Sequence, residues 1–125
     1  MSKDGVSEIK WLPDVEEHDY PAAASFLGLI FNDEYVKFII NNLKTAPITE
    51  FHVKDVIRAS GLAPLPLTNF HVNKDLKKIN DGKSLSPILL VRDEANGKVT
   101  IADGWHRVCA IYLTNEDALV HVKIV

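Results

Sequence analysis

Short apolar runs divide the second half of the chain into strand-sized segments. Residues 88–91 and 99–101 form two such runs, and the second consists entirely of the β-branched residues that strands favour. Asn96 and Gly97 lie between the runs, and both residue types tolerate a positive φ, so the pattern predicts a β-hairpin. A last apolar run, 120–125, predicts another strand.

Two segments of the same half carry apolar residues at helical spacing. After Gly104, the residues Val108, Ile111 and Tyr112 share one side of a predicted helix. The segment 71–79 is the second predicted helix, and it has one apolar and one basic face. The two faces consist of Val72, Leu76 and Ile79, and of His71, Lys74 and Lys78.

The first half, residues 1–60, is predicted to be mainly helical. Pro21 suits the first position of a helix that ends at Phe31 and is apolar on most sides, so we expect it to be buried or to form an interface. Asn32 is expected to cap a second amphipathic helix, 33–43. The remaining elements expected here are a strand over 49–53 and a helix over 54–60 that ends at Gly61.

Composition and charge narrow the class of protein. Of the 125 residues, 46% are hydrophobic and 25% charged, so we expect a single domain over residues 1–125 with a packed core. The net charge of -3 argues against general DNA binding through a basic surface. A single cysteine permits no internal disulfide, and no apolar run reaches membrane-spanning length. We therefore expect a cytoplasmic protein that has no membrane partner.

The turn Asp103-Gly104-Trp105-His106-Arg107 carries the candidate chemistry, because it joins a predicted strand to a predicted helix. A helix N-terminus offers free N–H groups and a partial positive charge, which attract anions. Gly104 lets a ligand approach the backbone, and Arg107 adds a charged fork that matches phosphate oxygens. His106 can donate a hydrogen bond, and its charge depends on pH. This combination indicates a phosphate site.

The same residues allow other interpretations. Asp103 is an anion at this position, so it caps the helix, pairs with Arg107 or binds a metal ion. In a purely structural interpretation Asp103 caps, Gly104 turns and Arg107 is a solvated charge. Trp105 either stacks on the base or ribose of a ligand, or packs against Trp11 or the N-terminal helices and closes the site.

A second polar cluster precedes the first predicted helix. Glu16, Glu17, His18 and Asp19 follow one another, and they form either a metal site or, the stronger interpretation, a solvated cap of that helix. The histidines of the chain have no HExxH or other metal-ligand spacing, so no metal ligand is predicted among them.

Residues 87–125 resemble the core of the ParB/sulfiredoxin superfamily, in which a strand pair leads into a Gly-x-x-Arg turn, a helix and a last strand. Residues 75–82 resemble the short helix and glycine turn that lead into that core. The resemblance implies an α+β fold in which residues 70–125 form a small mixed β-sheet flanked by helices. Residues 1–60 are then an N-terminal helical extension. It also implies a small bacterial protein that binds a nucleotide or phosphate.

The chain departs from each characterised branch of that superfamily. Trp105 stands where sulfiredoxins have their catalytic cysteine, and Cys109 is expected to face the core, so sulfiredoxin activity is not expected. The repeated arginines of partition ParB proteins are missing, and no helix-turn-helix follows Val125, so direct DNA binding is not expected. A third branch phosphorylates free serine and carries Asp-Gly-His-x-Arg; Asp103, Gly104 and Arg107 match that form.

Two functions follow from the resemblance. The first is a small phosphotransferase or nucleotide hydrolase that uses a nucleotide with Mg²⁺. Its catalytic residues are Asp103, as Mg²⁺ ligand or base, and His106, which orients or protonates a phosphate. The second is a non-catalytic binding or protein-interaction module, which forms a homo-oligomer through its apolar N-terminal helices. The residues expected to bind the phosphate or nucleotide are Gly104, Trp105, His106, Arg107, Lys74 and Lys78. For the two lysines a solvated helix face is the stronger interpretation.

Overall fold

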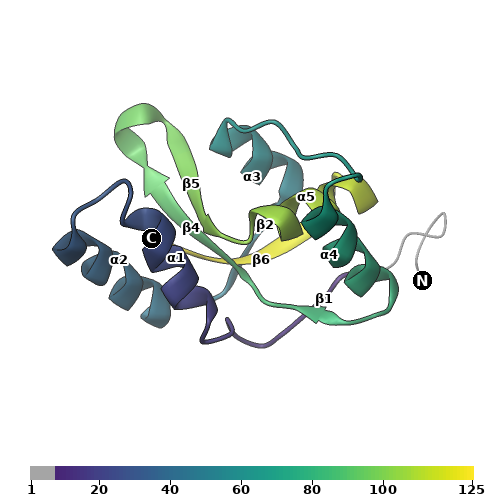
Figure 1. Cartoon of the computed structure of the whole chain (residues 1–125), viewed down its shortest axis with the longest axis horizontal. Helices are drawn as coiled ribbons and strands as arrows, with labels where there is room; N and C mark the ends of the chain where they lie inside the picture. The colour runs from purple at the N-terminus through teal and green to yellow at the C-terminus, as the bar shows by residue number, and fades with distance from the viewer. Residues whose placement is uncertain (1–7) are drawn as a thin grey trace.

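The computed structural model describes residues 8–125. Within them five α-helices surround a four-stranded mixed sheet, and a two-stranded sheet lies beside it (Figure 1). The expected α+β class is therefore confirmed. In chain order the elements are β1 (Lys10–Trp11), α1 (Asp19–Leu27), α2 (Asp33–Thr45), β2 (Thr49–His52), α3 (Val53–Ser60), α4 (Phe70–Asn80), β3 (Ser84–Leu85), β4 (Ile88–Asp93), the 3-10 turn η2 (Glu94–Asn96), β5 (Lys98–Asp103), α5 (Trp105–Thr114) and β6 (Leu119–Ile124).

The main sheet has the strand order β2-β6-β4-β5. β4 and β5 form the predicted antiparallel hairpin, and Gly97 at its turn has a φ of 63°. β6 runs parallel to β4 and antiparallel to β2, so β2 forms one edge of the sheet. β1 pairs in parallel with β3 in the small sheet. Within the described part of the first half, residues 8–60, the chain therefore supplies two strands as well as helices.

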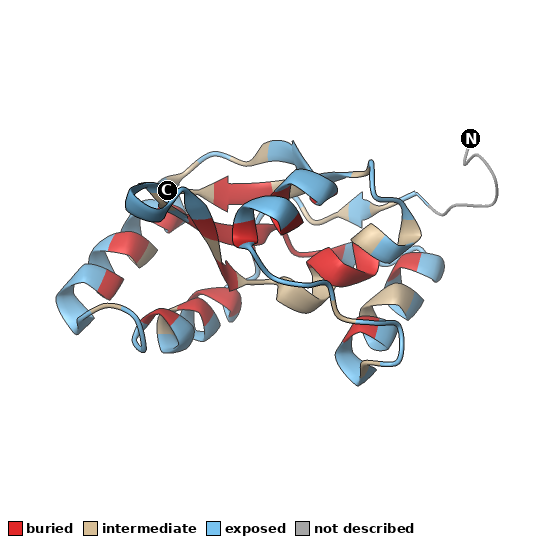
Figure 2. Cartoon of the chain, turned by 90° about the horizontal axis from the view of Figure 1, so that it is seen from above, coloured by how far each residue is buried: buried red, intermediate tan, exposed pale blue. Residues whose placement is uncertain are grey.

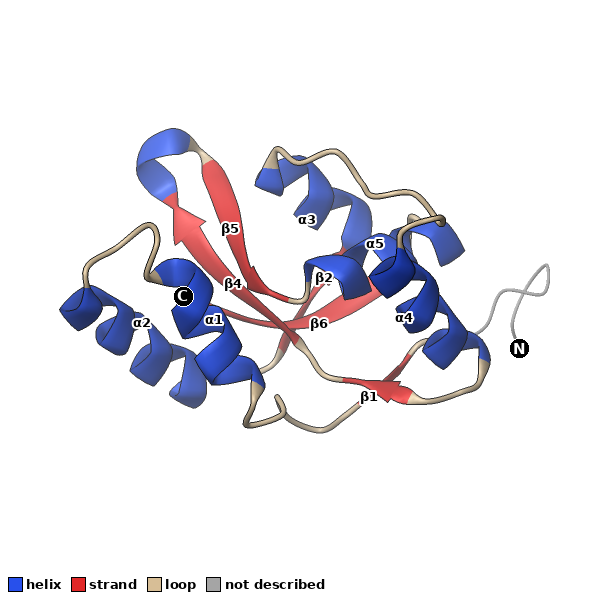
Figure 3. Ribbon diagram, viewed as in Figure 1, coloured by secondary structure: helices blue, strands red, loops and turns tan. Residues whose placement is uncertain are grey.

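Helices cover both faces of β4, which explains why a continuous apolar run forms this strand. Ile88 and Leu90 belong to the hydrophobic cluster under α3, α4 and α5. Leu89 and Val91 belong to a second cluster, under α1 and α2. All four side chains are buried, as expected for a strand that has helices on both sides. Figure 3 shows the two groups of helices on either side of the sheet, and Figure 2 shows the buried strands between them.

The helix boundaries follow local signals in two cases and depart from expectation in one. The side chain of Asn32 accepts a hydrogen bond from the Tyr35 N–H at 2.9 Å, so the predicted cap of α2 is confirmed. α3 ends at Gly61, in the left-handed conformation with a φ of 71°. The expected helix over 21–31 is wrong at both ends, because α1 spans Asp19–Leu27. The chain already turns helically before the proline, and it breaks at Gly28.

A buried lysine ties the α1–α2 pair to the sheet. The Lys123 ammonium group on β6 donates to the Tyr20 hydroxyl at 3.2 Å and to the Lys44 carbonyl at the end of α2, at 2.9 Å. It also pairs with the Asp14 carboxylate at 3.2 Å. Burial alone lowers the pKa of Lys123, but the partners Tyr20 and Asp14 outweigh burial and raise it above its ordinary value. The cation therefore stays charged inside the fold.

Candidate functional site

The turn between β5 and α5 has the predicted strand–glycine–helix form. Gly104 has a φ of 107°, and a Cβ atom there would lie 2.7 Å from Ile88 Cδ1 and 2.8 Å from Arg107 Nη2. Glycine is therefore required both by the backbone conformation and by the side chains packed against it. The Gly104 carbonyl accepts from the Val108 N–H at 2.9 Å and so begins the helix.

The predicted helix cap at Asp103 is wrong. Asp103 is the last residue of β5, and Gly104 occupies the cap position. No side chain within residues 8–125 accepts a hydrogen bond from the first turn of α5. The carboxylate is drawn away from that turn because it binds Arg107 instead. The N–H groups at the start of α5 thus keep the anion-attracting character of an uncapped helix N-terminus.

Arg107 turns inward and binds two carboxylates. Its Nη2 atom donates to Asp103 Oδ2 at 2.9 Å, and its Nη1 atom donates to Asp19 Oδ2 at 3.4 Å. The Arg107 side chain is only 15% exposed, and that of Asp19 only 5%. One of the alternatives considered for Asp103, a pair with Arg107, is thus confirmed. This geometry favours that pair over a Mg²⁺ ion held by Asp103, because the guanidinium already lies between the two acids.

Burial raises the pKa of the Asp103 carboxyl above its ordinary value. The guanidinium of Arg107 opposes this shift, and the nearby Asp19 carboxylate adds to it. The network places two acids around one guanidinium, and the raised pKa favours the protonated form of Asp103. The two acids engage Nη1 and Nη2 of Arg107, whereas its buried Nε atom has no hydrogen-bond partner among residues 8–125.

Asp19 and Ser86 complete this network, and sequence reasoning missed the role of both. The Ser86 hydroxyl donates to Asp19 Oδ2 at 2.6 Å and accepts from the Glu16 N–H at 3.1 Å. Asp19 was expected in a metal site or a solvated cap, but it is buried and paired. No local signal distinguishes this acid from its neighbours, since its partner Arg107 lies 88 positions away. We call Asp19, Ser86, Asp103 and Arg107 the inner network.

The Glu16, His18 and Asp19 side chains lie near the inner network. Their potential ligand atoms lie within 4.8 Å of one another. His18 Nε2 is 3.3 Å from Asp19 Oδ1 and 3.8 Å from Glu16 Oε1. The cluster adjoins the Arg107 guanidinium, whose charge opposes that of a bound cation.

His106, the neighbour of Arg107, faces α4 instead. Its ring centroid lies 4.9 Å from that of His71, and each histidine is the second residue of its helix. Phe70, which is 74% exposed, has its ring 5.4 Å from that of His71. Burial lowers the pKa of His106, and His71 lowers it further, while Asp75 opposes the shift. We call Phe70, His71 and His106 the outer cluster.

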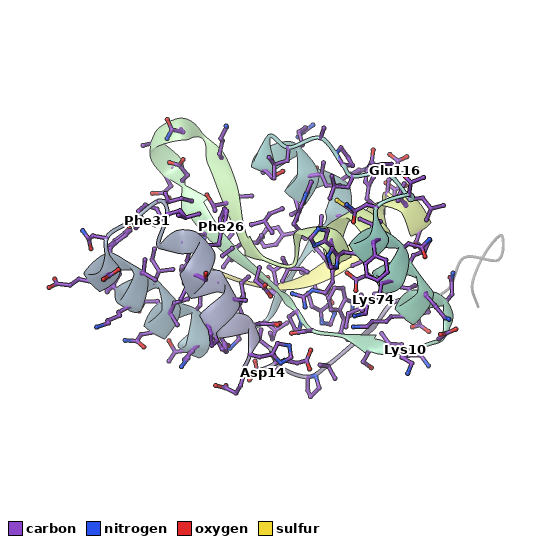
Figure 4. The ribbon with its side chains drawn as sticks, in the orientation of Figure 1. Lys10, Asp14, Phe26, Phe31, Lys74 and Glu116 are labelled. Carbon is purple, nitrogen blue, oxygen red and sulfur yellow. The ribbon has the colours of Figure 1, made fainter. Side chains whose placement is uncertain are left out.

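The other predicted site residues differ in their exposure to solvent. Lys74 and Lys78 are exposed on α4, one and two turns after His71, and Figure 4 labels Lys74 on that helix. Trp105 is half-buried and packs against the main core. Trp11 stacks on His121, with ring centroids 5.0 Å apart. The sequence placed His71 on the basic face of this helix but predicted only Lys74 and Lys78 as site residues, and it missed Phe70.

The single cysteine faces the core as predicted. Cys109 is buried, and its sulfur accepts from the Leu65 N–H at 3.4 Å. Burial raises the pKa of the thiol, which disfavours the reactive thiolate.

A cleft of about 370 Å³ lies elsewhere, between α3 and the β4–β5 hairpin. Its walls include Val56, Leu90 and Val99. None of the predicted site residues lines it.

Comparison of the chain with protein-family models, with curated proteins and with solved structures gives no match. Among residues 8–125, no helix combines the length and the apolar character needed to cross a bilayer.

Proposed function

We propose that the protein is a ParB/sulfiredoxin-like domain that binds a phosphate-bearing small molecule, a nucleotide, where α4 and α5 begin. The observation that carries this proposal is the contact of His71 with His106 at the first turns of the two helices, 4.9 Å between ring centroids. It lies beside the uncapped N-terminus of α5.

The groups at this position suit an anion. The N–H groups of the first turn of α5 have no side-chain acceptor within residues 8–125, and the helix dipole favours negative charge beside them. The two imidazoles donate hydrogen bonds to phosphate oxygens and gain charge when protonated. Lys74 and Lys78 add mobile cations on the same helix as His71.

The exposed ring of Phe70 supports a ligand that also carries a flat group. It is in edge contact with His71, so a base stacked on Phe70 would have its phosphates within reach of the imidazoles. Trp105, the first residue of α5, directly precedes His106 and packs against the core. A nucleotide combines both parts, whereas inorganic phosphate uses only the first.

The inner network supports binding rather than phosphoryl transfer. Arg107 and Asp103 are paired with each other, so neither is free to neutralise a transferring phosphate or to act as a base. Their role in this proposal is to hold Gly104 and the first turn of α5 in position. We therefore favour the non-catalytic binding module over the phosphotransferase or nucleotide hydrolase.

A thermal-shift and calorimetric comparison tests the proposal. ATP, CTP and inorganic phosphate, each with and without Mg²⁺, are added to the wild type, to His106→Ala and to Lys74→Ala. Lys77→Ala, on the neighbouring side of α4, is the matched control. Binding to the native state raises the melting temperature by mass action. We expect a nucleotide to stabilise the wild type and the control, Lys74→Ala to bind more weakly, and His106→Ala to lose most of the shift.

Two results would contradict the proposal. If no phosphate compound shifts the wild type, the protein does not have this function. If His106→Ala responds like the wild type, the ligand binds elsewhere. Turnover of ATP or CTP in the same samples would overturn the preference for a non-catalytic module.

A further inference from the structure

We propose that a second copy of this chain covers the exposed apolar end of the α1–α2 pair, so that the protein is a two-fold symmetric dimer. This apolar end consists of Phe26, Leu29, Ile30, Tyr35 and Phe38. It lies on the helix pair and the connection between its helices, whereas the proposed nucleotide site lies where α4 and α5 begin. The proposal therefore does not depend on that function.

α2 has two apolar sides, and the fold of one chain uses only one of them. Val36, Ile39 and Leu43 are buried in the cluster under the helix pair. Tyr35 and Phe38 form a second stripe that one chain leaves exposed. Ring contacts make this stripe continuous: Phe31 and Tyr35 have centroids 4.9 Å apart, and Tyr35 and Phe38 have centroids 6.0 Å apart. A helix that is apolar on two sides is normally covered on both.

The exposure of the five side chains is large. Leu29 is 86% exposed, Phe38 59%, Ile30 50%, Tyr35 47% and Phe26 43%. Figure 4 labels Phe26 and Phe31 toward the end of the helix pair that carries the α1–α2 connection. By contrast, Ala23 and Leu27 of α1 have no exposed surface, so the exposure is confined to one side of the helix.

The exposed area matches what a homodimer needs. With roughly 150–250 Å² for a fully exposed aromatic side chain and a similar area for Leu and Ile, the apolar end presents roughly 500 Å². A standard interface takes about 800 Å² from each partner, of which about 65% is apolar in homodimers, or about 500 Å². Patches of this size on monomers commonly mark interaction sites.

A second copy fits this surface because the surface is complementary to itself. Tyr35 and Phe38 lie about one helical turn apart on the exposed side of α2. In an antiparallel pairing of two α2 helices about a two-fold axis near residues 35–38, Tyr35 packs on the partner's Phe38. Such isologous pairing is the commonest symmetry of soluble oligomers.

Analytical ultracentrifugation and light scattering over about 1–200 µM protein test this proposal. We expect the wild type to shift from monomer to dimer over this range. Phe38→Glu places a charge in the apolar interface, so we expect it to raise the dissociation constant at least tenfold. Leu29→Ser should weaken the dimer as well. It changes a residue outside any helix, so its result holds even if Phe38→Glu fails to fold.

Leu62→Glu is the matched control, since Leu62 is 51% exposed but lies in the loop after α3. It should dimerise like the wild type. A wild type that stays monomeric at 200 µM overturns the proposal, and so does a Phe38→Glu variant that folds and still dimerises. If Leu62→Glu weakens the dimer as much as Phe38→Glu does, the interface lies elsewhere.

Discussion

His106 and Arg107 are neighbours in the first turn of one helix, yet they belong to opposite kinds of environment. Arg107 turns toward the interior, where Asp19 and Asp103 bind its guanidinium and the side chain is 15% exposed. His106 faces α4, where it meets the ring of His71. A short anion-binding motif therefore need not act as one unit, because successive residues of a helix project in different directions.

The two environments differ in what a substitution removes. In the inner network each charge is held by its partners, and removing one leaves the others buried without compensation. In the outer cluster the rings are partly exposed to solvent. Removing one of them therefore leaves no buried charge without a partner. Substitutions in the inner network should therefore change stability, and those in the outer cluster should change binding.

The largest expected effect is that of Arg107→Ala. It leaves Asp19 and Asp103 close together without their cation, so we expect a loss of about 3–5 kcal/mol of unfolding free energy at pH 7. Urea unfolding measures it. His106→Ala, the adjacent substitution, should cost less than about 1 kcal/mol.

Arg92→Ala is the control for that experiment, because Arg92 is exposed on β4. Its effect should stay within about 0.5 kcal/mol. If Arg107→Ala costs no more than Arg92→Ala, the inner network is not formed in solution, and the contrast between the two environments disappears.

A smaller effect is expected from Gly104→Ala. Alanine at this position would have an unfavourable φ, and its Cβ would press on Ile88 and on the Arg107 guanidinium. We therefore expect a loss of about 2–3 kcal/mol of unfolding free energy. Gly97→Ala is the matched control, because Gly97 also has a positive φ but its Cβ would meet nothing within 4 Å. It should cost about 1 kcal/mol. Equal losses in the two variants would mean that Arg107 does not pack over Gly104.

The smallest expected effect is a pH dependence of anion binding. Burial and His71 hold the pKa of His106 below its ordinary value of 6.5, so the ring of the free protein is mostly neutral at pH 7. Only its protonated form attracts an anion by charge. The affinity for sulfate, which keeps its charge in this range, should therefore rise several-fold from pH 7.5 to pH 5.5.

Isothermal titration at four or five pH values measures this dependence. His71 and Asp75 face His106 and contribute to the profile, so the test is the difference between the wild type and His106→Ala. The rise should be much smaller in the variant. If the profile of His106→Ala equals that of the wild type, His106 does not belong to the anion site. The outer cluster would then not be the binding surface.

Local features of the chain were predictable because their causes lie within a few residues. The hairpin turn at Gly97 and the cap at Asn32 follow from residue type and spacing alone. The pairing of the edge strand β2 was not predictable in the same way. The segment 49–52 was expected to be a strand, but no pattern in it identifies β6 as its partner. The helix at 21–31 was misplaced because no pattern identified the helical turn before Pro21.

The succession of strand, glycine and helix at 98–114 follows from the amino-acid sequence, since β-branched residues, Gly104 and helical spacing act over short distances. Which side chains of that turn face inward depends on contacts between distant segments of the folded chain. Asp19 reaches Arg107 from 88 positions away, and Ser86 holds Asp19 from a third segment. Burial of a carboxylate requires partners, and the folded chain alone brings them together. The candidate ligand surface therefore contains His106 and His71, whereas Arg107 belongs to the interior.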